Sequence, residues 1–227
     1  MRMTSLLVGD IRFQFKYGFY FLYLVFSLLY IALLFALPEE WREKVAILMI
    51  FSDPAAMGLF FMGAIVLYEK SERVLNSIAV SPVIVYEYVL SKLFSIAAIS
   101  TVVALVIGVS SGVISNAFYF ILGVFLCSCL FSAIGIMIAA QISTLNQFIL
   151  ATIPVELVIN IPAIAYLFGW KSEWLLLHPG VCMIEMCENG ENVIQASLIL
   201  TVWTVLLILL ACRVVKKMLQ SVGGIKL

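Results

Sequence analysis

The chain has 227 residues, of which 64% are hydrophobic and only 11% charged, and its mean hydropathy is +1.17. A soluble domain carries about 25% charged residues, so this composition excludes an ordinary water-soluble protein and indicates a membrane protein. The formal net charge is zero and there is no basic run, which disfavours nucleic acid as a partner. The five cysteines show no CxxC spacing and the chain has one histidine, so no metal site is predicted.

The first segment, Arg2–Lys16, places three apolar side chains on one helical face and basic residues opposite. This pattern predicts a helix over residues 1–16 that lies in the membrane interface. Asp10 and Gln14 interrupt its apolar arc, and a frayed tail is the alternative.

The rest of the chain is dominated by continuous apolar runs, which predict transmembrane helices rather than the alternating pattern of a barrel. A helix needs about 20 residues to cross a hydrocarbon core of roughly 30 Å, and six runs are long enough. The sequence therefore predicts an all-α integral membrane protein forming one domain over residues 1–227. The six expected spans lie near Tyr17–Leu37, Val45–Tyr68, Leu90–Ile114, Ala117–Ala140, Phe148–Gly169 and Val193–Cys212.

The basic residues predict the orientation of these spans. If both termini face the cytoplasm, ten of the thirteen lysines and arginines lie inside, and only Arg42, Lys44 and Lys171 lie outside. Cytoplasmic loops are enriched in these residues. We therefore expect a multi-pass protein of the bacterial cytoplasmic membrane with both termini in the cytoplasm.

Charged residues also gather in the loop Glu69–Lys92, between the expected second and third spans. Its first part favours a short helix with Leu75 and Ile78 on one face. Pro82 ends that helix, and Ser81 is placed to cap the next one. The apolar face indicates a docking surface for a soluble partner; the alternative is that the charges are the solvated ends of two spans.

The order Glu69-Lys70, Leu75, Ser81-Pro82, Glu87 and Lys92 resembles the inner loop of ABC-2 type transporter permeases. That family often has Gly-Thr where this chain has Arg73-Val74, so the match is incomplete at those two positions. The resemblance extends to the six spans, the cytoplasmic N-terminus and the longer outer segment between the fifth and sixth spans.

The resemblance implies that the loop over residues 69–92 contains a coupling helix seated on a separate ATPase subunit. The chain lacks a GxxxxGK[ST] phosphate loop, so we expect it to be no enzyme and to hold no cofactor, with ATP and Mg²⁺ bound by the partner. The residues expected to couple the two subunits are Glu69, Glu72, Arg73, Leu75, Ile78, Ser81 and Pro82.

The resemblance implies the permease subunit of an ABC exporter, with the drug-export type as one candidate, together with a second permease copy or sister permease and two ATPase subunits. Its cargo would be an amphipathic drug, a lipid-like molecule or a hydrophobic peptide. The alternative is a small secondary transporter driven by protons through Glu156. An intramembrane enzyme is disfavoured because Glu156 stands alone, without a second acid or a Ser/His pair in the spans.

Two acidic positions are candidates for the substrate route. Glu156 lies inside the fifth span with Asn160 one turn further on and a proline on either side of the pair. An acid at this depth is costly and marks either a functional group or a packing contact. Asp53 precedes Pro54, a pattern typical of a helix start, and predicts a break near the outer end of the second span.

The outer loop over residues 170–192 is too apolar in its first half for a simple tether. Trp170 and Trp174 suit the membrane interface, and the resemblance implies a re-entrant segment here. Cys182 and Cys187 lie five apart, which on a helix points them away from each other and disfavours a disulfide. His178, before a proline, is expected to be a turn residue.

Overall fold

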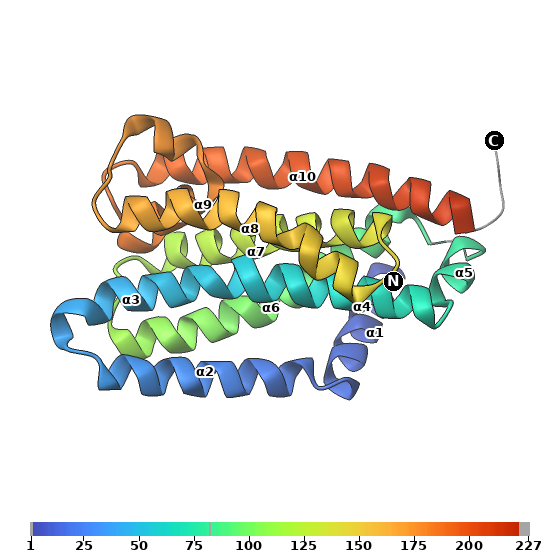
Figure 1. The fold of residues 1–227 in the computed structure, drawn as a ribbon, viewed down its shortest axis with the longest axis horizontal. Helices are drawn as coiled ribbons and strands as arrows, with labels where there is room; N and C mark the ends of the chain where they lie inside the picture. Colours follow the sequence, from blue (N-terminus) through green and yellow to red (C-terminus); the bar gives the residue numbers. More distant parts are fainter. Residues whose placement is uncertain (1, 82, 223–227) are drawn as a thin grey trace.

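The computed structural model describes the backbone of residues 2–81 and 83–222, and every regular element in those ranges is helical. The all-α prediction is confirmed for that part of the chain. Figure 1 shows the long helices side by side in one bundle, with α5 at one end. The elements are α1 (Arg2–Lys16), α2 (Phe19–Ala36), α3 (Glu39–Ser52), the π-helix η1 (Asp53–Gly58), α4 (Leu59–Ser71), α5 (Val74–Ala79), α6 (Val85–Ser111), α7 (Ala117–Gln141), α8 (Leu145–Leu167), the 3-10 helix η2 (Glu173–Leu177), α9 (Pro179–Glu188) and α10 (Val193–Val222).

Five helices of the described part are long and apolar enough to cross a membrane, namely α2, α6, α7, α8 and α10. They cover the first, third, fourth, fifth and sixth expected spans. The second expected span, Val45–Tyr68, is instead divided among α3, η1 and α4, none of which reaches the length of a span alone. A proline at position 54 supplies no N–H to the helical ladder, and this accounts for the interruption at η1.

Helix α7 lies at the centre of the bundle and packs against α10, α4, α6 and α9. Small residues allow the closest of these approaches. A Cβ atom added at Gly135 would fall on the backbone carbonyl oxygen of Leu59 in α4, so only glycine permits this spacing of the two helices.

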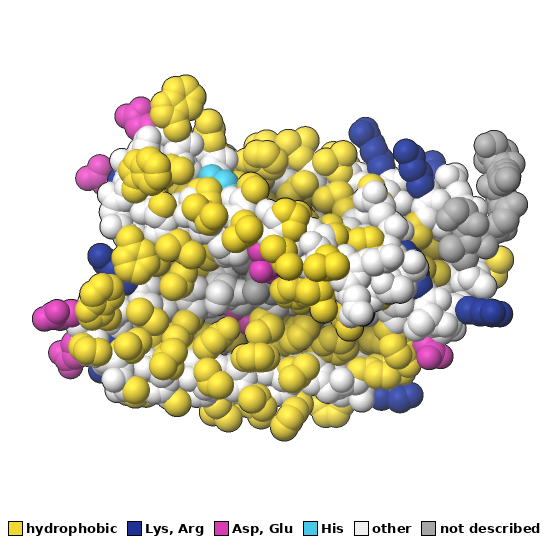
Figure 2. All heavy atoms as spheres, viewed as in Figure 1, with side chains coloured by type: hydrophobic (Ala, Val, Ile, Leu, Met, Phe, Trp, Pro, Cys, Tyr) yellow, Lys and Arg dark blue, Asp and Glu magenta, His cyan; other side chains and the backbone are white. Residues whose placement is uncertain are grey.

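The face of the bundle shown in Figure 2 is hydrophobic over most of its length. The peripheral helix α2, for example, exposes Phe21, Leu24 and Leu28. In the same view Lys and Arg side chains gather toward the end that carries α5, and most acidic side chains lie toward the other end (Figure 2). An apolar belt between two charged ends is the surface expected of a protein that spans a bilayer.

Candidate functional site

The loop between α4 and α6 carries α5 at the end of the bundle (Figure 1). Leu75 is 1% exposed, and the partly buried Ile78 packs against the same core. Because α5 contacts α10 and α4, this apolar face is turned toward the protein itself, which corrects the expectation that it is presented to a partner. The outward side consists of Glu72, Arg73, Val74, Asn76, Ser77 and Val80.

The connection from α5 to α6 also differs from the expectation for Ser81. The Ser81 hydroxyl donates to the carbonyl of Ile78 at 2.8 Å, so it closes α5 rather than capping α6. Helix α6 begins after Ile84, whose N–H donates to the Glu87 carboxylate at 3.1 Å. The expected helix-breaking role of Pro82 lies outside the described residues.

The two stems of this loop meet in a buried ionic cluster around Lys92, which is 2% exposed. Its ammonium donates to Glu69 of α4 at 2.5 Å and to Asp10 of α1 at 3.0 Å. The Tyr88 hydroxyl donates to the second oxygen of Glu69 at 2.7 Å. Glu69 therefore lies inside the protein, and its side chain is not available for direct contact with a soluble partner.

Asp10 and Gln14, which interrupt the apolar arc of α1 in the sequence, are the residues that fasten α1 to α6. Asp10 accepts hydrogen bonds from Lys92 and from the Ser91 hydroxyl at 2.7 Å. Gln14 is 2% exposed and donates to Ser95 at 2.6 Å. Sequence reasoning missed these contacts because it treated α1 only as a surface helix.

Lys70 fastens the same loop to the end of α7. Its ammonium donates to three backbone carbonyls, of Ala139 at 2.6 Å, Ala140 at 2.8 Å and Ile142 at 2.8 Å. These carbonyls belong to the last turn of a helix and the residue after it, where a cation is favoured. Both stems of the α5 loop are thus fixed to neighbouring helices by buried or half-buried lysines.

Asp53 occupies a closed position in the middle of the bundle. It opens η1 and is 0% exposed, and among the described residues no donor makes a hydrogen bond to either carboxylate oxygen. The Ser100 hydroxyl of α6 is the neighbouring donor, and it also shares a hydrogen bond with the Tyr23 hydroxyl on α2 at 3.1 Å. Among the described residues no cation forms an ion pair with the carboxylate.

The expected break falls at Asp53, which begins η1, and its place near the outer end of the second span stays a prediction. Helix α3 contributes 14 residues before it, or about 21 Å of helix at 1.5 Å per residue. Asp53 is thus a fully buried acid within an expected span, whereas Glu156 is half-buried.

A cavity of about 420 Å³ lies between α2 and α6 and is open to the outside of the bundle, where its lining residues Leu24 and Val102 are exposed. Tyr23 forms part of its wall and is close enough to Asp53 to interact with its charge. The remaining wall is mostly aliphatic, with Tyr20 and Ser27 as the other polar side chains. The cavity is thus an apolar space with a polar group at one side.

Glu156 and Asn160 lie on one side of α8, as expected, but they do not bond through their side chains. The Asn160 amide donates to the backbone carbonyl of Glu156 at 2.9 Å. Glu156 is half-buried, and its Oε1 atom has no hydrogen-bond partner among the described residues. Figure 2 shows acidic atoms in a hollow about halfway along the hydrophobic face.

The outer loop returns into the bundle as α9, whose residues 180–187 are buried. This helix packs against α10, α7 and α8, and Trp170 and Trp174 remain exposed beside it. His178 precedes α9 as the expected turn residue, and burial lowers its pKa.

The two cysteines of α9 are free thiols. Burial raises the pKa of Cys182 to about 12, and it raises the pKa of Cys187 to about 12 as well. Both therefore remain protonated at neutral pH, and the expectation that they form no disulfide agrees with the structure.

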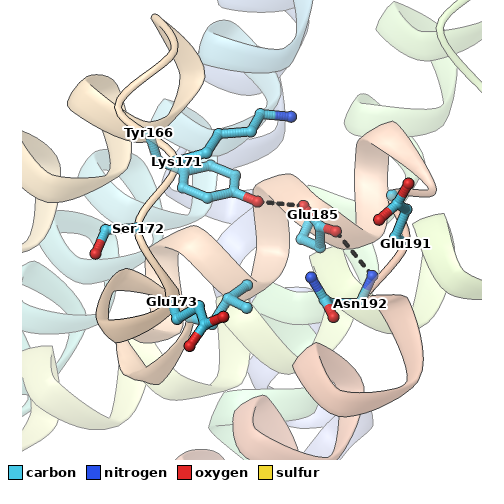
Figure 3. A pocket seen from close by; sticks show the side chains of 9 residues that line it. Tyr166, Lys171, Ser172, Glu173, Glu185, Glu191 and Asn192 are labelled. Atoms are coloured by element: carbon cyan, nitrogen blue, oxygen red, sulfur yellow. Dashed lines mark hydrogen bonds between the residues drawn. The ribbon is translucent and has the colours of Figure 1, made fainter.

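Sequence reasoning missed a polar pocket of about 420 Å³ at this end of the molecule (Figure 3). Glu185 of α9 points into it and accepts hydrogen bonds from the Tyr166 hydroxyl and from the backbone N–H of Asn192 at 3.1 Å. Glu173, Glu191 and Lys171 lie around it. The only sequence signal was an excess of acids in the loop, which did not indicate that one of them is buried.

A helical bundle with a hydrophobic belt, charged ends and isolated buried acids defines a multi-pass membrane protein of the transporter class. The chain belongs to the fluoroquinolones export permease protein family, whose sequence model matches residues 1–221. Among its relatives are the fluoroquinolones export permease proteins of two Mycobacterium tuberculosis strains, CDC 1551 and H37Rv. Each is 29% identical over 158 residues, which cover 68% of this chain and 67% of the relative.

Proposed function

We propose that this protein is the permease subunit of an ATP-driven exporter in the bacterial cytoplasmic membrane. Membership of an export permease family carries the proposal. The ABC-2 type loop pattern supports coupling to a separate ATPase. In this arrangement the chain crosses the membrane six times, with α3, η1 and α4 together forming the second span, and both termini lie in the cytoplasm with α5.

The surroundings of α5 support its role as the coupling helix. Its outward side carries Glu72, Arg73 and the 84% exposed Val80. Lys70 and Lys92 fix the two stems to α7, α1 and α4. A displacement of α5 by an ATPase is therefore transmitted to several helices at once. In this scheme Leu75 and Glu69 hold the coupling helix in place, whereas Arg73 and Val80 contact the partner.

A second permease copy and two ATPase subunits would complete the exporter, as in the family that the loop resembles. The cargo is an amphipathic drug, and the names of the relatives point to fluoroquinolones. The largely aliphatic cavity between α2 and α6 suits the apolar part of such a molecule.

Purification of the tagged protein in mild detergent, with mass spectrometry of co-purifying chains, tests ATPase coupling. We expect a stoichiometric ATPase with the native protein, and its loss on Val80→Asp. Val80 is the site for this change because Leu75 is buried, so altering Leu75 would disturb the fold. The control is Glu40→Gln, a change of an exposed acid at the opposite end of the bundle, which should keep the ATPase. Absence of any ATPase from the native sample would contradict the proposal.

The half-buried Glu156 with its unpartnered oxygen favours one other function, a transporter driven by protons. Collapsing the proton gradient while ATP is maintained separates the two. We expect export to continue in the native protein and in Glu156→Gln. Loss of export by the native protein when the gradient collapses, together with loss of export in Glu156→Gln, would establish the proton-driven alternative.

A further inference from the structure

The position of Asp53 requires a partner that the described residues do not supply. An ionised carboxylate without a counter-ion in a low-dielectric interior costs several kcal/mol. Asp53 makes no ion pair with any described residue, and the two polar side chains that interact with it, Tyr23 and Ser100, are neutral. Such a group is stable either as a neutral acid or opposite a cation that arrives from elsewhere.

We propose that Asp53 is the acceptor for a protonated amine of the exported molecule. This inference rests on the proposed function, because it assigns a chemical class to the cargo of the same permease. An ammonium group supplies both the charge and the hydrogen-bond donors that the two carboxylate oxygens of Asp53 lack.

The cavity between α2 and α6 provides the place for the rest of the molecule. At about 420 Å³ it has the size of a small-molecule site, and its aliphatic wall suits an aromatic or aliphatic body. Tyr23 belongs both to this wall and to the polar group around Asp53. Asp53 is closed to solvent and does not itself line this cavity, so the amine reaches it only when side chains between them, Tyr23 among the candidates, move.

The backbone at Asp53 suits such a rearrangement. Asp53 starts a π-helical segment between two α-helices, and π-segments are frequent at functional sites. Glu156 is a weaker candidate for the amine, since it is only half-buried and just one of its carboxylate oxygens is enclosed without a hydrogen-bond partner.

A matched pair of ligands tests the charge requirement. One is a fluoroquinolone with a free piperazine amine, and the other is the same molecule acetylated at that nitrogen, which removes the positive charge. Binding of each to the purified full-length protein is measured by ligand fluorescence. We expect the native protein to bind the amine at least tenfold more tightly than the acetylated form. Asp53→Asn should abolish this preference, and Glu40→Gln, an exposed acid changed in the same way, should retain it.

The outcomes distinguish a failure of the proposed function from a failure of this inference alone. Binding of neither ligand by the native protein contradicts the proposed cargo and this inference together. Equal binding of both, or a preference that survives Asp53→Asn, overturns this inference and leaves export of quinolones standing.

A second measurement avoids dependence on the folding of the variant. A hydrophobic carbodiimide is reacted with the native protein, and modification of Asp53 is quantified by mass spectrometry at saturating concentrations of each ligand. The amine should protect Asp53 and the acetylated ligand should not. Equal modification with bound amine and without ligand would overturn the proposal.

Discussion

Lys92 on α6 and Glu69 on α4 form an ion pair of 2.5 Å in a place where the lysine side chain is 2% and the glutamate side chain 9% exposed. Asp10 on α1 contacts the same ammonium at 3.0 Å. One cation thus joins the helix before the α5 loop, the helix after it and the N-terminal helix.

We expect Lys92→Met to destabilise the protein by about 3–5 kcal/mol, because it leaves two carboxylates buried without their cation. Thermal unfolding in detergent, followed by circular dichroism, measures the change. A control is Lys216→Met on the exposed side of α10, which should change the free energy of unfolding by less than about 0.5 kcal/mol.

The double change Lys92→Met with Glu69→Gln tests whether the charge itself causes the loss. Because one of the two stranded carboxylates is then neutral, it should recover part of the stability. A double variant as unstable as the sum of the single ones would instead indicate that packing decides the effect.

Arg73 adopts a left-handed backbone conformation, with φ 56°, immediately before α5. ABC-2 type permeases often have glycine in this part of the loop, and glycine has no steric penalty in that conformation. We expect Arg73→Gly to raise the free energy of unfolding by about 0.5–1 kcal/mol, whereas Arg73→Ala keeps the penalty and gives no gain. Equal effects of the two substitutions on the unfolding temperature would contradict this explanation.

The sequence predicted the helical class, the five helices long and apolar enough to cross a membrane and the break around η1, because each depends on local apolar length or on a proline. It could not predict which way α5 faces, since Leu75 has the same spacing whether it meets a partner or α10. In the sequence, Asp10 and Gln14 only interrupted the apolar face of an amphipathic helix, and nothing indicated their contacts with α6.

The partners of those two residues, Lys92 and Ser95, lie about 80 positions away. Contacts of this kind depend on tertiary packing. The burial of Asp53 could not be predicted from the sequence for the same reason. Its sequence position indicated a helix break, and only the packing of α6 and α7 around η1 revealed complete burial.

Lys70 stabilises the end of α7 through three carbonyl contacts. We expect Lys70→Met to keep most of the side-chain packing and to cost about 1–3 kcal/mol, since half-buried carbonyls lose their donor. Hydrogen exchange provides a local measurement, with faster exchange expected at the end of α7 than at its start. An unchanged exchange pattern there would show that water replaces the ammonium without cost.

Glycine at two positions should respond to alanine in opposite directions. At Gly9, on the exposed side of α1, an added Cβ meets no described atom within 4 Å, so Gly9→Ala should stabilise the helix by up to about 1 kcal/mol. At Gly135 the Cβ falls on the Leu59 carbonyl, and α4 and α7 must separate to accept it. We expect a loss of about 1–3 kcal/mol there. Thermal unfolding of the two variants compares these effects directly. If Gly135→Ala were also stabilising, α4 and α7 would have to be packed less closely than described, and the rigid link from the α5 loop to the centre of the bundle would lose its basis.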